Sequence, residues 1–260
     1  MTAEAGAMED FPAIRAGGFV AFAAGFHAEG MSEDRVGELC GLCASGFSDR
    51  SVLVKDSRGT TAWIADSGSG RVFVKIFNAY SWRRRLRRFL VTPRPVTVMR
   101  ATEKLQSVVP VPELLLALRD GRRLHAIVTR AYASPLIAAE QLDYVAANIG
   151  VFSHALADSI NKMHNAGVYH GDLKFHNILL RTRPDGGCIT GVFDFDGTRL
   201  FNRPVTGRRR HREWARIISS CIRLGCGDFR EEFIAAAGGL DRALLDAELE
   251  RFFIKEAGKK

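Results

Sequence analysis

The sequence has few of the features that mark membrane-spanning, secreted or repetitive proteins. Its longest apolar stretch near the start, Gly18–Phe26, is nine residues, well short of the roughly 20 that cross a bilayer. No basic segment precedes this stretch, and Glu4, Glu9 and Asp10 are acidic, so we expect no secretory signal. Five cysteines, an odd number, do not suit a disulfide framework, and eight prolines give no low-complexity bias. We therefore expect a globular protein of a reducing cytoplasm.

The cysteines give little support for a metal centre. Cys40 and Cys43 form a single C-x-x-C, whereas a zinc site needs a second pair at suitable spacing. Cys221 and Cys226 are distant in sequence and differently spaced. Buried thiols are therefore the better interpretation of these residues.

Positive charge is concentrated in one part of the chain. The formal net charge is +8, and residues 71–130 hold fourteen Lys and Arg against three acidic residues, so the remainder is slightly acidic. A local surplus of this size indicates an anionic partner, such as a nucleic acid, an anionic membrane surface or a phosphorylated substrate. No nucleic-acid-binding motif is present, so we expect no nucleic acid.

Short apolar segments separated by turns predict an antiparallel meander in the first half of the chain. The expected strands are 51–55, 61–65 and 71–77, with tight turns at 56–60 and 67–70. Lys75 lies inside the third of these strands. It is either a solvated lysine at a sheet edge or a buried functional group.

The rest of the chain alternates between helical and extended patterns. We expect helices at 33–43, 82–89, 97–107, 149–163, 212–223, 229–237 and 240–253. We expect extended segments at 108–117, 125–129, 168–169, 178–180 and 188–193, with a linker around 134–135. The helix at 97–107 carries Glu103.

Two motifs in the second half carry the chemistry. Residues 170–180 read H-G-D-L-K-F-H-N-I-L-L, and residues 192–197 read V-F-D-F-D-G. An Asp and an Asn five residues apart on one loop, followed by an Asp at the end of the next strand, is the arrangement of protein kinases. Phosphoryl transfer needs positioning and charge neutralisation, which these residue types supply.

Each part of a phosphoryl-transfer site has a candidate. Asp172 would act as the base for the acceptor hydroxyl, and Lys174 would reach the transferring phosphate. Oxygen ligands suit Mg²⁺, and the metal candidates are Asn177, Asp194 and Asp196. The strand lysine Lys75 would bind the nucleotide phosphates, with Glu103 as its partner.

The two motifs together resemble the lipopolysaccharide kinase family, whose members phosphorylate 3-deoxy-D-manno-octulosonic acid (Kdo) or heptose in the lipopolysaccharide inner core. The resemblance covers roughly Ser51–Arg223 and includes V-F-V-K-I-F, the arginine-rich stretch after it and V-P-V-P-E. It implies an α+β, protein-kinase-like bilobal fold, with ATP and Mg²⁺. The small lobe would be an antiparallel sheet at 49–133, the mainly helical lobe would be 134–260, and 1–48 has no assigned role.

Several departures from protein kinases favour a glycan or small-molecule acceptor. No G-x-G-x-x-G loop precedes Lys75, and no A-P-E segment is present. Gly171 stands where many protein kinases have arginine, and Asp196 replaces the glycine of D-F-G. A carboxylate at that position resembles small-molecule kinases such as choline kinases.

The basic residues fit an acceptor of this kind, since Kdo-lipid A is anionic and membrane-embedded. One cluster lies beside Trp82 and Phe89 and suits a phosphate-rich membrane surface: Arg83, Arg84, Arg85, Arg87 and Arg88. A second follows the predicted metal-binding strand, where kinases bind their acceptor: Arg208, Arg209, Arg210 and Arg212. Either cluster could instead be a solvated charged face. The resemblance implies a cytoplasmic enzyme, peripheral on the inner face of the inner membrane.

The sequence thus predicts an ATP-dependent kinase of an inner-core sugar hydroxyl, on Kdo or on heptose. A small-molecule kinase of the aminoglycoside or choline type is the alternative enzyme. Its acceptors are soluble, so this alternative does not explain the arginine-rich stretch. A membrane-tethered pseudokinase binding module is the non-enzyme alternative. The presence of Lys75, Asp172, Asn177 and Asp194 speaks against it.

Overall fold

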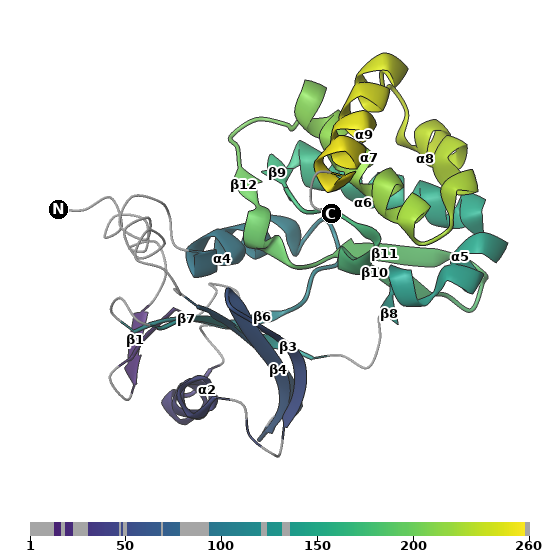
Figure 1. The fold of residues 1–260 in the computed structure, drawn as a ribbon. Coiled ribbons are helices and arrows are strands. Elements are labelled where there is room, and N and C mark those ends of the chain that lie inside the picture. Colours follow the sequence, from purple (N-terminus) through teal and green to yellow (C-terminus); the bar gives the residue numbers. More distant parts are fainter. Residues whose placement is uncertain are drawn as a thin grey trace. The chain divides into compact units, whose positions relative to one another are not determined.

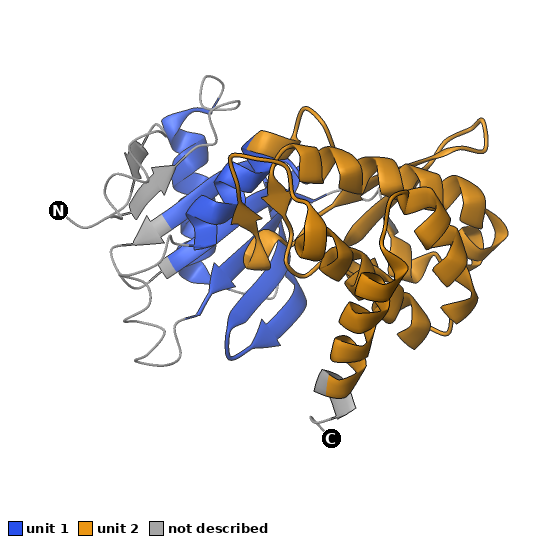
Figure 2. Ribbon diagram, turned by 90° about the horizontal axis from the view of Figure 1, so that it is seen from above, with its two compact units in different colours: residues 1–103, 112–132 blue, residues 104–111, 133–260 orange. Residues whose placement is uncertain are grey.

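The computed structural model describes residues 13–16, 19–22, 31–46, 48, 51–68, 70–78, 94–120, 124–131 and 136–257 (Figure 1). The helix expected at 82–89, with its five arginines, lies outside the described residues, as does the linker at 134–135. The chain divides into two compact units (Figure 2). The first unit comprises residues 1–103 and 112–132, and the second comprises 104–111 and 133–260.

An antiparallel sheet forms the larger part of the first unit. Among the described residues it has seven strands in the order β1-β2-β6-β7-β5-β4-β3. The strands are β1 (Ala13–Ala16), β2 (Phe19–Phe22), β3 (Ser51–Ser57), β4 (Thr60–Ser67), β5 (Gly70–Phe77), β6 (Leu114–Asp120) and β7 (Leu124–Arg130). The predicted meander is confirmed as β3, β4 and β5, and the strand predicted at 125–129 as β7. The pattern did not predict β1 and β2, and it gave β6 only as part of an extended segment.

Lys75 occupies a central strand of this sheet and not an edge. Strand β5 pairs with β4 on one side, where Lys75 faces Ala62, and with β7 on the other, where it faces Ile127. Its side chain is buried, and its Nζ lies 5.5 Å from the centre of the Phe77 ring. The interpretation of Lys75 as a solvated lysine at a sheet edge is therefore wrong. A buried lysine is rarely retained without a role that compensates its desolvation.

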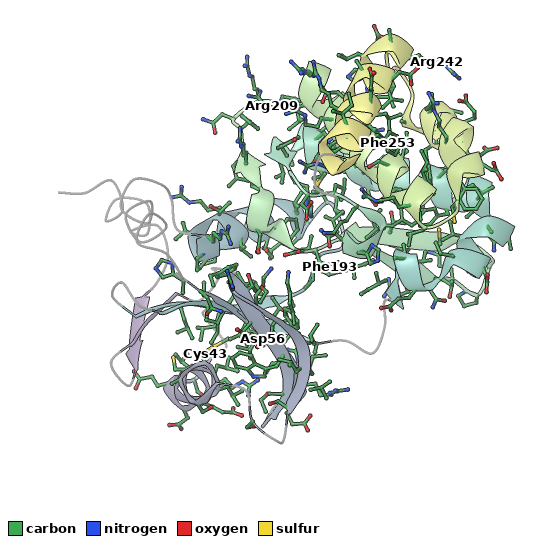
Figure 3. The ribbon with its side chains drawn as sticks, viewed as in Figure 1. Cys43, Asp56, Phe193, Arg209, Arg242 and Phe253 are labelled. Carbon is green, nitrogen blue, oxygen red and sulfur yellow. The ribbon has the colours of Figure 1, made fainter. Side chains whose placement is uncertain are left out.

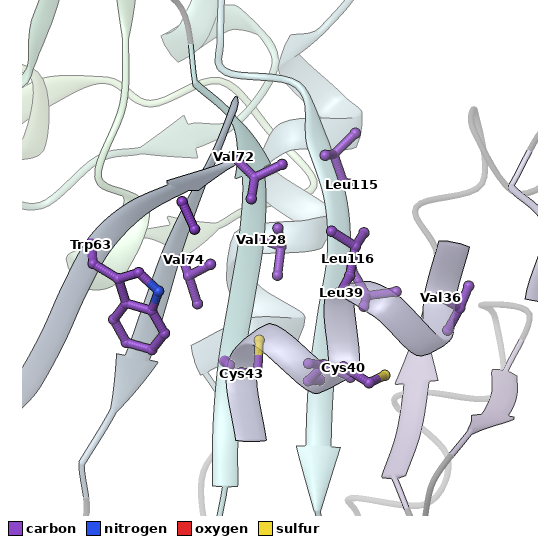
Figure 4. Packing of buried hydrophobic residues seen from close by; sticks show 13 residues of the cluster. Val36, Leu39, Cys40, Cys43, Trp63, Val72, Val74, Leu115, Leu116 and Val128 are labelled. Carbon is purple, nitrogen blue, oxygen red and sulfur yellow. The ribbon is translucent and has the colours of Figure 1, made fainter. Parts of the chain in front are cut away.

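Helix α2 (Glu33–Ser45) closes one side of the sheet core. Its buried residues Val36, Leu39, Cys40 and Cys43 pack with Trp63 and with apolar residues of the other strands (Figure 4). Burial raises the pKa of the Cys43 thiol to about 12. Within the part of the chain that the structure describes, no group of three His, Cys, Asp or Glu side chains could hold a metal. The buried-thiol interpretation of the C-x-x-C pair agrees with this packing.

Helix α4 (Arg94–Leu105) begins three residues before the predicted start. Pro95 lies in its first turn, where a missing backbone N–H costs no intrahelical hydrogen bond. The helix ends where the Leu105 carbonyl accepts hydrogen bonds from the Val108 and Val109 amides, each at 2.8 Å. Glu103 lies on its exposed side.

The second unit is mainly helical. Its α-helices are α5 (Leu142–Ala147), α6 (Ile149–Asn165), α7 (Gly207–Arg223), α8 (Arg230–Ala237) and α9 (Arg242–Ala257). Its short strands are β8 (Leu136–Ile137), β9 (Val168–Tyr169), β10 (Ile178–Thr182), β11 (Cys188–Val192) and β12 (Arg199–Leu200). Phe152, Phe175 and Phe233 pack together in its core, with ring centres 5.8 to 6.3 Å apart.

The predicted helices of this unit are confirmed, with one shift that matters for the basic residues. Helix α7 begins at Gly207, five residues before its predicted start, so Arg208, Arg209 and Arg210 lie in its first turn. No helix among the residues that the structure describes is long and apolar enough to cross a bilayer. A sheet-rich first unit and a helical second unit make the α+β class that the sequence predicted.

Gly191 gives a test of the packing around the β10–β11 hairpin. A Cβ at this position would lie 2.2 Å from the Pro110 carbonyl oxygen, which also accepts a hydrogen bond from the Val192 amide at 3.0 Å. We expect Gly191→Ala to lower the free energy of unfolding by about 2–3 kcal/mol in denaturant titrations. Gly150→Ala in α6, where nothing lies within 4 Å, should be neutral or stabilising. Equal effects of the two changes would contradict this packing.

Candidate active site

The loop between β9 and β10, residues 170–177, holds the predicted catalytic residues. Lys174 Nζ donates to Asp172 Oδ2 at 3.0 Å, and both side chains remain partly exposed. The buried Asn177 side chain donates from Nδ2 to the Asp172 backbone carbonyl at 2.8 Å. The loop therefore brings Asp172, Lys174 and Asn177 together, as the sequence predicted, and leaves the Asp172 carboxylate accessible.

His170 joins this loop to the end of β11. The imidazole is fully buried, and its Nε2 lies 2.8 Å from the Phe193 carbonyl oxygen. The Asp172 amide donates to Nδ1 at 3.3 Å, so the hydrogen bonds place the ring proton on Nε2. His170 thus orients the Asp172 backbone and fixes Phe193 (Figure 3), the residue before Asp194.

Gly171 has a steric reason to be glycine. Its φ is +80°, and a Cβ would lie 2.2 Å from the Gly197 carbonyl oxygen. Any side chain at this position would push the two loops apart. This contact explains why the arginine of many protein kinases is absent here.

Asp194 is held in an uncommon backbone conformation beside Asn177. Its φ and ψ are 68° and 58°, and it is the one non-glycine residue with positive φ among those that the structure describes. The preceding Phe193 amide donates to the Asn177 carbonyl at 3.2 Å, and the following Phe195 packs on His170 at 5.3 Å. Left-handed non-glycine residues cluster at functional sites, where surrounding contacts hold them.

The metal candidates suit a hard cation. Because Nδ2 of Asn177 is committed to the Asp172 carbonyl, its Oδ1 is the atom left to act as a ligand. With the carboxylates of Asp194 and Asp196 on the adjoining segment, the donors are all oxygens. Mg²⁺ is commonly bound by one or two carboxylates together with substrate phosphates.

Glu213 on α7 is a structural centre of the site that the sequence did not identify. Its fully buried carboxylate accepts from the His170 amide at 3.0 Å, from the Gly171 amide at 2.6 Å and from His164 Nε2 at 3.0 Å. An acidic residue four positions before Ile217, on the apolar face of a predicted helix, was the available signal. Such a carboxylate is retained inside a protein only when donors surround it.

The two site candidates in the first unit, Lys75 and Glu103, have fewer observed contacts that support their predicted roles. Lys75 is buried in β5, as described above, whereas Glu103 is exposed on α4. The structure shows Glu103 in no ion pair with a described residue. Lys75 is itself a described residue, so this structure does not show the Lys75–Glu103 pair, and the pairing stays a prediction.

The arginines at the start of α7 have different environments. Arg210 donates to the Ala237 and Gly238 carbonyls at 2.7 and 2.8 Å and so caps the end of α8. Arg208 donates to the buried Glu248 at 2.5 Å. Arg209, labelled in Figure 3, has its guanidinium 4.5 Å from the centre of the Phe201 ring. Arg208 and Arg210 therefore have structural contacts, which makes Arg209 the better candidate of the three for a ligand.

Glu213→Gln tests the support of the catalytic loop. A glutamine places an NH₂ group against backbone donors, so we expect a loss of about 3 kcal/mol in unfolding free energy. We also expect at least a tenfold loss of turnover at a temperature where the variant is folded. Glu232→Gln, on the exposed side of α8, is the control and should change neither. Wild-type stability in Glu213→Gln would contradict the role of Glu213.

Comparisons with known proteins add to this geometry. A search of curated proteins finds no match. Among solved structures, the chain is similar to one described as "WaaP in complex with acyl carrier protein", with a TM-score of 0.53 and 18% identity. That match covers 80% of this chain and 88% of the other, and at this identity it supports the fold.

A family model adds evidence from the sequence itself. The model of the lipopolysaccharide kinase (Kdo/WaaP) family matches residues 82–233, more than half of the chain. The matched segment contains the catalytic loop, Asp194 and Glu213. Kinases of this family phosphorylate sugars of the lipopolysaccharide core, and the chain described here belongs to this family.

Proposed function

We propose that the protein transfers the γ-phosphate of ATP to a hydroxyl of Kdo in the lipopolysaccharide inner core, with heptose as the alternative acceptor sugar. The observation that carries the proposal is the loop in which Asp172, Lys174 and Asn177 are joined by hydrogen bonds. Its support comes from the family match over residues 82–233. A small-molecule kinase of the aminoglycoside or choline type stays the enzyme alternative.

Asp172 and Lys174 carry the proposed chemistry at the acceptor. The Asp172 carboxylate accepts a hydrogen bond from the attacking hydroxyl and takes its proton as the bond to phosphorus forms. Lys174 holds that carboxylate at 3.0 Å and contributes positive charge close to the transferring phosphoryl group. In the first unit, Lys75 is proposed to bind the nucleotide phosphates, with Glu103 as its partner.

Mg²⁺ is the proposed metal, held by Asn177, Asp194 and Asp196 together with the phosphates of ATP. A bound Mg²⁺ supplies neutralisation of the charge that develops on the phosphates. The chain's own contribution is to fix its oxygens in advance, through the Asn177 side-chain hydrogen bond and the left-handed backbone of Asp194.

The proposed place of action is the inner face of the inner membrane, where a Kdo-lipid A precursor is embedded. The support is the surplus of Lys and Arg in residues 71–130, which favours an anionic surface. Arg83, Arg84, Arg85, Arg87 and Arg88 are proposed as the membrane contact, although they lie outside the described residues. An acyl carrier protein is a further candidate partner, because the similar structure contains one.

An acceptor panel tests the proposed function directly. Purified protein is incubated with radiolabelled ATP and Mg²⁺ and with Kdo-lipid A, heptosylated lipid A or soluble aminoglycosides. We expect label on Kdo-lipid A, at a rate at least tenfold above that on any aminoglycoside. Label on heptosylated lipid A alone would replace Kdo by heptose as the acceptor.

The other outcomes of the panel separate the alternatives. Preferential labelling of aminoglycosides would contradict the lipopolysaccharide proposal and favour the small-molecule kinase. A protein that binds no ATP and labels no acceptor would instead be a pseudokinase binding module.

Two carboxylate variants separate the acceptor role from the metal role. Asp172→Asn should lower kcat at least about 100-fold, because the carboxylate that accepts the hydroxyl proton and pairs with Lys174 is lost. ATP binding should stay nearly intact, because the metal candidates Asn177, Asp194 and Asp196 are unchanged. Asp194→Asn should weaken the binding of Mg²⁺-ATP itself. Both are measured by single-turnover kinetics and by titration with a fluorescent ATP analogue.

The matched control for this pair is Asp228→Asn. Asp228 is an exposed aspartate of the same unit that lies far along the chain from both motifs, so the change should affect neither measurement. Equal and mild effects of Asp172→Asn and Asp194→Asn would contradict the separate roles assigned to them.

A further inference from the structure

A surface beside the catalytic loop gathers arginines around one tyrosine. Strand β9 ends at Tyr169, directly before His170, and pairs antiparallel with β12. In this pairing Arg199 lies opposite Tyr169, and directly opposed residues share one face of an antiparallel pair. Arg199 is exposed, whereas Tyr169 is buried.

Helix α7 brings further arginines to the same surface. Arg209, Arg212 and Arg216 follow each other at steps of three and four residues and therefore form one stripe along the helix. Arg209 lies over the Phe201 ring at 4.5 Å, and Arg216 lies over the Phe252 ring at 5.3 Å. The aromatic contacts hold the guanidinium groups while leaving their edges available for hydrogen bonds.

Three of the arginines, Arg199, Arg212 and Arg216, act electrostatically on the Tyr169 phenol. Burial and the charge of Glu213 raise the pKa of Tyr169, and the charges of Arg216, Arg212 and Arg199 oppose that rise. The arginine cluster is defined as Arg199, Arg212 and Arg216, which act on Tyr169, together with Arg209, which lies in the same stripe of α7.

The acidic groups close to the cluster do not neutralise it. Glu248 accepts from Arg208, from Arg212 at 2.9 Å and from Arg251 at 2.6 Å, so one carboxylate serves three guanidinium groups. Burial disfavours the Glu248 carboxylate, but the Arg208 and Arg212 hydrogen bonds outweigh it and lower the pKa of Glu248. Glu213, the other carboxylate near Tyr169, already accepts hydrogen bonds from two backbone amides and from His164.

Donors in the cluster have no acceptor among the residues that the structure describes. Nη1 of Arg216 is buried and has no hydrogen-bond partner there. Arg199 is in no ion pair with a described residue. A buried charged donor without an acceptor is costly, so negative charge near Arg216 is favourable. The exposed Arg199 guanidinium is open to such an anion directly.

Three segments of the chain connect the cluster to the catalytic loop. Tyr169 is three residues before Asp172, so their Cα atoms are at most about 10 Å apart. Arg199 is two residues after Gly197, whose carbonyl lies against Gly171. Arg212 precedes Glu213, which holds the His170 and Gly171 amides. The cluster is therefore attached to the segments that hold the loop carrying Asp172.

We propose that the arginine cluster is the subsite that binds an anionic group of the acceptor, a carboxylate or a phosphate ester, and so places the acceptor hydroxyl at Asp172. This inference rests on the proposed function, because it assigns a part of the same acceptor. Planar guanidinium groups bind both kinds of anion through paired hydrogen bonds, which gives orientation as well as charge.

Kinetics of three variants test the subsite. Arg199→Gln, Arg212→Gln and Arg216→Gln should each raise the KM for Kdo-lipid A at least tenfold. The KM for ATP should change less than threefold, because the anion belongs to the acceptor. Arg251→Gln is the matched control: it removes one guanidinium from Glu248, as Arg212→Gln does, without touching the cluster. Circular dichroism and thermal unfolding confirm that each variant is folded.

Modified acceptors identify which anion binds. The same kinetics are measured with lipid A phosphates removed and with the Kdo carboxylate esterified. One modification should raise the KM of the wild type and abolish the difference in KM between wild type and the arginine variants. The group that this modification removes is the anion that the cluster binds. Unchanged KM in folded Arg199→Gln and Arg216→Gln, or equal sensitivity of the variants to every acceptor, would overturn the subsite.

A binding measurement separates this inference from the proposed function. Calorimetry measures inorganic phosphate and free Kdo binding to the full chain, with the nucleotide site filled by a non-hydrolysable ATP analogue. Binding to wild type that is lost in Arg199→Gln and Arg216→Gln supports the subsite even if no lipopolysaccharide acceptor is phosphorylated. Phosphorylation of Kdo-lipid A with no effect of these substitutions on binding or KM would overturn the subsite alone.

Discussion

The buried Glu213 carboxylate is the interaction on which the catalytic loop depends. Helix α7 places it beneath the loop, where it accepts hydrogen bonds from two successive amides, His170 and Gly171, and from His164. A carboxylate in this position is stable because three donors replace its water, and removal of any of them would leave charge uncompensated. The loop is thereby tied to a long helix, and rigid support of this kind keeps catalytic groups in place.

A continuous set of hydrogen bonds connects Glu213 to the metal-binding candidates. His170 links the Asp172 amide to the Phe193 carbonyl, and the Asn177 side chain closes the loop on the Asp172 carbonyl. The strained Asp194 follows Phe193 directly. Preorganisation of this kind matters in phosphoryl transfer, where catalysis is mostly positioning and charge stabilisation.

The sequence predicted the candidate catalytic and metal-binding residues, and it missed the residues that hold them in place. Asp172, Asn177 and Asp194 are visible because chemistry fixes their types and their spacing along the chain. Glu213 is 41 residues from Asp172, and its role depends on the packing of α7 under the loop, which no local pattern encodes. The sequence predicts β6 only as part of an extended segment, because the prolines at 110 and 112, just before the strand, indicate extended backbone but no strand pairing.

The basic residues show the same limit. Counting charges found the arginines at 208–212 but could not separate their environments. Arg210 caps α8, Arg209 lies over the Phe201 ring, and Arg212 acts on the charge of Tyr169. Arg199 and Arg216 entered no motif, because a strand pairing and a helix stripe bring them together only in the folded chain.

A crystal structure of the protein with Mn²⁺ and a non-hydrolysable ATP analogue tests the proposed metal ligands and the proposed role of Asp172. The anomalous signal of manganese locates the ion without reference to the protein. We expect an ion bound by Asn177 Oδ1 and the Asp194 carboxylate at about 2.0–2.2 Å, with the Asp172 carboxylate facing the terminal phosphate. An ion held by other residues, or a nucleotide bound away from the loop at 170–177, would contradict these roles.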